Sequence, residues 1–169
     1  MSNKSSNFGF GLLEIVVSTA LISASLFSLA YMSKIALRAT TESFLNVKAS
    51  FLAEEALEAV RFVRDNGWSA NIDPVIAGDA YYVLFSAGGW SIATSSQGLV
   101  GGIFERAVFF ENVYRSIEDD SIVPEESGEP KVLDPDTVKV TAVVSRLKGF
   151  EAATSSVEFT TYVTNLFED

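Results

Sequence analysis

The stretch Phe8–Ser33, FGFGLLEIVVSTALISASLFSLAYMS, decides the fold, because its only charged side chain is that of Glu14. About 20 apolar residues in a helix cross the roughly 30 Å hydrocarbon core of a bilayer, so this stretch is long enough to span a membrane. A secretory signal peptide fits less well, since its apolar region covers about 7–15 residues and ends in a cleavage site that breaks the pattern. A helix buried in a large core would need more surrounding chain than 169 residues of this composition provide.

A short polar segment, MSNKSSNFG, precedes the apolar run, with Lys4 as its only charged side chain and Gly9 as its last residue. Gly9, Phe10 and Glu14 together resemble the start of type IV pilins and pseudopilins, where a short basic leader ending in Gly precedes a Phe-initiated apolar helix. The resemblance implies that residues 1–9 form a leader peptide. A prepilin peptidase would cut between Gly9 and Phe10 on the cytoplasmic side and N-methylate Phe10.

The carboxylate of Glu14 is a candidate functional group on physical grounds as well. An ionised acid at the centre of a membrane helix costs about 2.5–3.5 kcal/mol on insertion scales, and the apolar run holds no Lys or Arg to pair with it. The N-terminal end of a helix favours an anion. The resemblance implies that Glu14 meets the N-terminal amine of Phe10 in an adjacent subunit. The alternative is a carboxylate at the membrane interface that reaches cytoplasmic water.

The resemblance is strongest over Lys4–Arg38 and weaker beyond it. Gly11 departs from the family, which usually has Thr at the second mature position. Leu13 stands where the family has another aliphatic residue. Neither difference affects the residues expected to be cleaved or to form the ion pair. Leu52–Trp68 and Glu158–Leu166 look like segments of minor-pilin-like proteins, which favours an accessory subunit over the major one.

Composition narrows the classes of function. The formal net charge of −10 argues against nucleic acid as a partner, because phosphate binding depends on clustered Lys and Arg. The chain has no histidine and no cysteine, which excludes zinc sites built on these ligands, cysteine nucleophiles and Ser-His triads. We therefore expect neither an enzyme nor a cofactor, and a body held together by packing without disulfides.

The helical pattern continues over residues 34–66, without Gly or Pro until Asn66-Gly67, where we expect the helix to end. Glu58, Arg61 and Asp65 lie on a charged face with ion-pairing spacing. The opposite face predicts an amphipathic helix, because apolar residues recur at three- and four-residue steps: Leu45, Ala49, Leu52, Ala56, Val60 and Val63.

Residues 67–169 change to the period-two patterning of strands, which predicts a small antiparallel sheet. The expected strands are Tyr81–Ser86, Trp90–Thr94, Phe104–Tyr114, Val138–Leu147 and Val157–Val163. The first two form a hairpin about Ala87-Gly88-Gly89. In the third, Phe104, Ala107 and Phe109 or Phe110 compete for the inward face. The predicted fold class is α+β: a long N-terminal helix, half membrane-spanning (10–33) and half amphipathic (34–66), packed on a small antiparallel sheet, as in pilins.

The acidic segment 117–137, IEDDSIVPEESGEPKVLDPDT, contains three of the four prolines and predicts an irregular surface loop. Its carboxylates suggest a second interpretation, a calcium site, because calcium binds hard oxygen ligands. The spacing does not match an EF-hand loop. The candidate ligands are the carboxylates of Asp119, Asp120, Asp134 and Asp136, and also those of Glu125 and Glu126.

These observations predict a structural subunit of a type IV pilus or related filament, in the cytoplasmic membrane and then in the filament. Its expected partners are a prepilin peptidase, other pilin subunits and membrane lipids. The leader would stay in the cytoplasm and the β-domain would lie outside, although Lys34 and Arg38 on the outer side run against the positive-inside rule. A secretion or competence pseudopilus stays open. The alternative is a single-pass anchor whose extracytoplasmic β-domain is a binding module.

Overall fold

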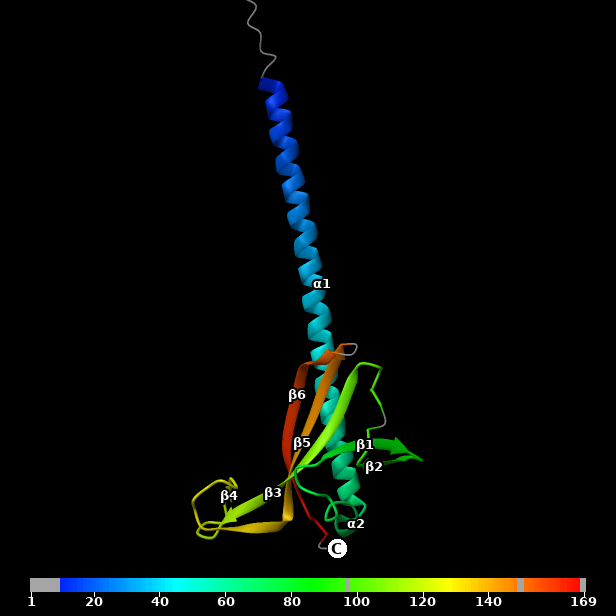
Figure 1. Ribbon diagram of the computed structural model, residues 1–169, viewed down its shortest axis with the longest axis vertical. Coiled ribbons are helices and arrows are strands. Elements are labelled where there is room, and N and C mark those ends of the chain that lie inside the picture. Colours follow the sequence, from blue (N-terminus) through cyan, green and yellow to red (C-terminus); the bar gives the residue numbers. More distant parts are fainter. Residues whose placement is uncertain (1–9, 97, 149–150, 168–169) are drawn as a thin grey trace, which may run out of the picture. The chain divides into compact units, whose positions relative to one another are not determined.

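The computed structural model describes residues 10–96, 98–148 and 151–167, so the predicted leader, with Gly9, lies outside the described residues. The chain divides into two compact units, Met1–Leu45 and Asn46–Asp169. One helix, α1 (Phe10–Asp65), supplies the whole described part of the first unit and the beginning of the second (Figure 1).

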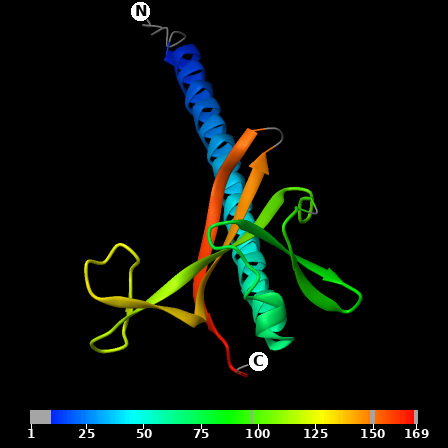
Figure 2. The same ribbon diagram turned by 60° about the horizontal axis from the view of Figure 1, so that its bottom comes forward.

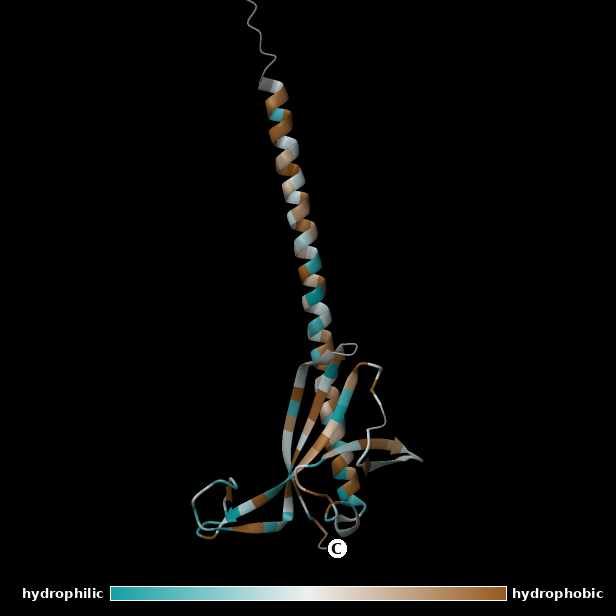
Figure 3. Ribbon diagram, in the orientation of Figure 1, coloured by the Kyte–Doolittle hydropathy of each residue, from teal (hydrophilic) through white to brown (hydrophobic). Residues whose placement is uncertain are grey.

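The first unit is apolar helix with its side chains uncovered. Every side chain from Gly11 to Phe44 is exposed, and apolar residues predominate in its first two thirds (Figure 3). The helix is long and apolar enough to cross a membrane. The hydroxyls of Thr19, Ser25, Ser28 and Ser33 each donate a hydrogen bond to the carbonyl four residues earlier, at 2.8–2.9 Å. These polar groups are therefore satisfied inside the helix, as lipid surroundings require.

In the second unit, α1 buries one stripe of its surface. Ala53, Ala56, Ala59 and Val60 have no exposed surface. The predicted apolar stripe is confirmed, since its members from Ala49 to Val63 are buried and only Leu45 is half-exposed.

The end of α1 agrees with the sequence, because the helix stops at Asp65, before Asn66-Gly67. Gly67 has φ of 127°, in a region that suits glycine. It leads into α2 (Trp68–Asn71), a single turn that the sequence did not predict and that buries the Trp68 indole.

The rest of the second unit is one six-stranded antiparallel sheet, which confirms the α+β fold class. Its strand order is β2-β1-β3-β5-β6, with β4 also paired to β3 (Figures 1 and 2). The strands are β1 (Ala80–Ser86), β2 (Gly89–Ala93), β3 (Phe104–Ser116), β4 (Ile122–Val123), β5 (Lys131–Lys148) and β6 (Glu151–Thr164).

The core lies between α1 and one face of this sheet. Phe110 is opposite Val140, and Val108 is opposite Ala142, so these side chains share a face, and all four are buried. The open question about the third strand is settled, because Phe104 and Phe110 point inward while Ala107 and Phe109 belong to the other face.

Two sequence expectations need correction. The hairpin turn is Ala87-Gly88 alone, since Gly89 pairs with Ser86. The acidic segment 117–137 is not irregular throughout, because it contains β4 and the beginning of β5. Here β5 pairs with β3 through residues 131–134, and the register then shifts so that residues 135–137 are extra. The pairing of these residues with β3 outweighs the turn signals of Pro135 and the acids around it.

We call this part of the second unit the arm: residues 113–116 of β3, β4, residues 131–134 of β5 and their connecting loops. It extends away from the remainder of the sheet (Figures 1 and 2).

Candidate functional site

Glu14 lies in α1 one turn after Phe10, the first residue of the helix. Its side chain is exposed, and side chains of a helix lean toward its N-terminus. Within residues 10–96, 98–148 and 151–167, none of the ion pairs includes Glu14.

The expected help from the helix dipole is smaller than the sequence suggested. No acidic residue lies in the first turn of α1, and the dipole's effect falls off within that turn. The predicted cleavage residue Gly9 lies outside the described residues. The backbone of Phe10 belongs to the helix, so a new N-terminus at this residue would fall at the helix end.

The four calcium candidates lie in or beside the arm but are directed to other partners. Asp134 accepts a hydrogen bond from Arg115 at 2.6 Å. Asp120 lies 3.9 Å from the same guanidinium. The Asp119 carboxylate accepts from the hydroxyl and amide of Ser121, and the Asp136 carboxylate accepts from the side-chain amide of Asn165 at 3.4 Å. Among the residues that the structure describes, no group of three acids is placed to hold a metal ion.

These contacts change the acid–base properties of the arm. Burial raises the pKa of Asp134, but hydrogen bonds from Arg115 and Thr137 and the charge of Arg115 outweigh it, so this pKa lies below its ordinary value. The hydrogen bond to Asp134 in turn raises the pKa of Arg115. Hydrogen bonds from Ser121 lower the pKa of Asp119. Asp119 and Asp134 thus stabilise the arm in their ionised forms.

A cavity of about 480 Å³ lies where the arm leaves the sheet. It was missed from the sequence, because its walls come from five separate segments that only the fold brings together. For two of its glutamates, Glu125 and Glu126, the sequence suggests only a role as calcium ligands. The lining residues are Ala77, Gly78, Glu111, Asn112, Val113, Ile122, Val123, Pro124, Glu125, Glu126, Lys139 and Tyr162.

A second missed feature is Arg106 on β3, which connects the helix to the hairpin. Its guanidinium pairs with Glu55 of α1 at 2.7 Å and lies 5.5 Å from the ring centre of Trp90. The Arg106 side chain is only 8% exposed. Of the ion pairs expected on α1, Glu58–Arg61 forms, whereas Asp65 pairs with Arg64 instead.

Comparisons of the chain with models of protein families, with curated proteins and with solved structures found no match. The roles proposed below therefore depend on the residues of this chain and on the resemblance of its N-terminal segment to prepilins.

Proposed function

We propose that the chain is a structural subunit, a minor pilin or pseudopilin, of a type IV pilus or related filament, and that it polymerises through the first unit of α1. One observation carries this proposal. The junction Gly9-Phe10 with Glu14 stands at the start of a helix whose side chains from Gly11 to Phe44 are all exposed.

An apolar surface of this extent needs a cover. Leu21 is 65% exposed and Phe27 is 77% exposed, and burying one such side chain is worth about 1.5–3 kcal/mol. Lipid covers the helix before assembly, and copies of the same helix cover it afterwards. Between helices in lipid the attraction comes from close packing, which small residues allow. The run supplies several such residues: Ser18, Ala20, Ser23, Ala24, Ser25 and Ser28.

Glu14 sets the register between copies in this proposal. Removal of the leader would create an amine at Phe10, and the carboxylate of a neighbouring Glu14 is the anion in the apolar run that can meet it. Pairing removes the cost of an isolated charge in lipid, about 2.5–3.5 kcal/mol. An ordinary membrane anchor has no use for either group.

The processing step gives the first test. A prepilin peptidase expressed with the chain should shorten it by nine residues and leave N-methylated Phe10 as its first residue. Gly9→Val should block the cut, because the peptidase has to seat the backbone closely. Mass spectrometry that finds intact Met1 in assembled material would contradict the proposal.

Incorporation of Glu14→Gln gives the second test. This variant keeps the shape and polarity of the side chain but loses the charge, so membrane insertion should persist or improve while incorporation into sheared filaments falls. Glu42→Gln is the matched control, since it removes a carboxylate from the same helix beyond the apolar run and should leave incorporation unchanged. A single-pass anchor with a binding module predicts no difference between the two variants. Normal incorporation of Glu14→Gln would remove Glu14 from the mechanism.

A further inference from the structure

The strand β6 forms one edge of the sheet and has a free side. Among the residues that the structure describes, β6 pairs with β5 alone. From Ser155 to Thr164 its register with β5 is regular, without a bulge. This stretch contains no proline, lysine or arginine, and its only charge is that of Glu158. Proline, lysine and bulges are the usual means by which an edge strand avoids further pairing, so this edge is open to another strand.

Two hydrogen bonds show which backbone groups point to the free edge. The Asn165 amide donates to the Asp136 carbonyl at 2.8 Å, which continues the register of the two strands. Hydrogen-bonded and non-hydrogen-bonded pairs alternate in an antiparallel ladder, so the odd-numbered residues of β6 bond to β5 and the even-numbered ones face outward. The 3.1 Å contact between the Thr141 and Thr160 hydroxyls agrees, because side chains lie closer in non-hydrogen-bonded pairs. The outward-facing residues are Ser156, Glu158, Thr160, Tyr162 and Thr164.

The core is incompletely covered along this edge. Val157 and Phe159 share a face with Val144 and Ala142, to which they pair. Val144 and Ala142 are buried against α1, whereas Val157 and Phe159 are half-exposed. Removing apolar surface of this kind from water is favourable. Apolar side chains of an added strand on the same face would cover these two residues.

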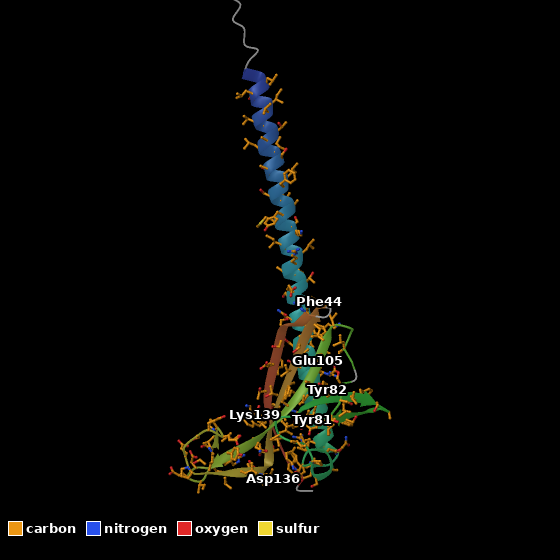
Figure 4. The ribbon with its side chains drawn as sticks, viewed as in Figure 1. Phe44, Tyr81, Tyr82, Glu105, Asp136 and Lys139 are labelled. Atoms are coloured by element: carbon orange, nitrogen blue, oxygen red, sulfur yellow. The ribbon has the colours of Figure 1, made fainter. Side chains whose placement is uncertain are left out.

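The one charge of this edge lies on the opposite, outer face of the sheet. Val143 is opposite Glu158 on β5, and none of the ion pairs in the described part of the chain includes Glu158. Lys139, on the same face of β5 (Figure 4), pairs with Glu111 at 3.0 Å instead. Opposite charges on neighbouring strands stabilise a sheet. A lysine or arginine is therefore favoured at the position of an added strand that faces Glu158.

The arm favours a narrow occupant. Figures 1 and 2 both place the arm on the side of the free edge, beside the C-terminal end of β6. A whole second sheet laid along β6 would meet the arm there. A single extended segment that pairs only as far as Thr160 stops short of it, so such a segment is the occupant that this edge favours.

We propose that the free edge of β6 binds a short extended segment of a partner protein, with Lys or Arg opposite Glu158 and apolar residues on either side of it. The segment adds an antiparallel strand along residues 156–160. Its backbone hydrogen bonds give affinity. Its apolar side chains lie on Val157 and Phe159 because successive side chains of a strand point to opposite faces, and its basic residue gives selectivity. This binding activity goes beyond the proposed function and does not depend on filament assembly.

The first experiment tests strand addition with the full chain in detergent micelles. The probe is a fluorescently labelled, end-capped pentapeptide, Thr-Ile-Lys-Ile-Thr, and fluorescence anisotropy measures its binding, with empty micelles as background. Two doubly N-methylated forms are compared, one methylated at both isoleucines and one at the lysine and the second threonine. In the proposed register the isoleucine amides point away from β6 and the other amides point toward it. The first form should keep its affinity, and the second should bind about tenfold more weakly. Equal losses, or the reverse order, would overturn the proposed register.

The second experiment tests the place and the charge. Glu158→Lys should weaken binding of the Lys peptide about fivefold and strengthen binding of Thr-Ile-Glu-Ile-Thr by a similar factor, because it exchanges like and opposite charges across the new strand pair. Glu105→Lys is the matched control. It makes the same change of charge on β3, away from the free edge (Figure 4), and should change either affinity less than about twofold.

Three outcomes would overturn the proposal. Equal shifts in the two variants would assign the binding to the overall charge of the chain. Equal affinity of the parent chain for the Lys and Glu peptides would remove the selectivity of Glu158. Failure of the parent chain to bind the Lys peptide saturably at millimolar concentration would remove the site.

Discussion

The two parts of α1 differ in where their apolar surface goes. In the first unit every side chain from Gly11 to Phe44 is exposed, whereas in the second unit Ala53, Ala56 and Val60 have no exposed surface at all. Both parts are continuous helix. From Gly11 to Ser33 apolar residues surround the helix. In the second part the buried apolar residues keep to one stripe, and Val47, Phe51 and Phe62 are exposed outside it.

This difference shows that the spacing of apolar residues along a helix, more than their number, indicates which surface the chain covers with its own residues. A stripe needs one partner, and the sheet of the same chain supplies it. A helix that is apolar all round needs cover on every side. The described residues do not supply this cover, and lipid or neighbouring copies would provide it. Each prediction below contrasts the self-covered part with the uncovered part.

The largest expected effect is that of a charge in the self-covered stripe. Val60→Asp should destabilise the second unit by more than about 4 kcal/mol, since it places an unpaired carboxylate where no surface is exposed. Leu21→Asp should leave unfolding of that unit unchanged and reduce the amount of chain in the membrane. Fluorescence of the buried Trp68 indole in detergent reports unfolding. Equal loss of stability in both variants would abolish the contrast.

A smaller effect is expected for the ion pair that joins the stripe to the sheet. Arg106→Met should cost about 2 kcal/mol, because the guanidinium is buried between Glu55 and Trp90 while Glu55 remains half-exposed. Arg61→Met is the matched control, since the Arg61–Glu58 pair is largely exposed, and it should cost less than about 1 kcal/mol. Denaturant unfolding measures both. If the two variants lost the same stability, Arg106 would have no special part in joining α1 to β3.

Acid should loosen the arm before the core under α1. The pKa of Asp134 is lowered in the folded state, so its contribution to stability is complete above its unfolded value, about pH 4, and is lost as pH falls through the lower folded value. The core stripe is uncharged and has no such dependence. Hydrogen exchange should show amides of residues 113–116 losing protection at acid pH while those of residues 140–144 keep it. Asp134→Asn should abolish the difference, and the same acid midpoint for both groups of amides would contradict it.

The smallest effect concerns a hydroxyl of the uncovered part. Ser28 donates to the Ala24 carbonyl at 2.9 Å, so Ser28→Ala leaves no polar group unpaired and should leave the membrane level and filament incorporation unchanged. Ser28→Leu should keep the membrane level but lower incorporation, because a large side chain prevents close approach of helices. Quantitative immunoblots of membranes and sheared filaments measure both. Equal incorporation of the two variants would mean that copies do not pack on this side of the helix.

Local patterns predicted most of the fold. The stripe from Ala49 to Val63 and the five longer strands follow from period and composition, because each is a property of neighbouring residues. The helical turn α2 and the strand pairing of residues 131–134 were not predicted, since Pro135 and the acids around it have the composition of a loop. Pairing with β3, distant in sequence, overrides that local preference.

The candidate sites divide in the same way. Glu14 was found from sequence, because one charge in a long apolar run is a local signal. The cavity lined by Glu111, Glu125 and Glu126 was not, because its walls come from segments that are distant in sequence. The sequence suggested the acids of the arm as calcium ligands. In the structure, Asp134 instead accepts a hydrogen bond from Arg115.

The most direct test of the central proposal asks whether the start of one α1 meets the start of another. The chain has no cysteine, so a disulfide can form only between introduced residues. Two differently tagged chains, Gly11→Cys and Ile15→Cys, are expressed together with a prepilin peptidase and an assembly system, and membranes and filaments are oxidised. These positions adjoin Phe10 and Glu14, so the account predicts disulfide-linked dimers that carry both tags and that disappear when Gly9→Val is added to both chains. Absence of such dimers, with both chains at the parental level in the membrane, would contradict it.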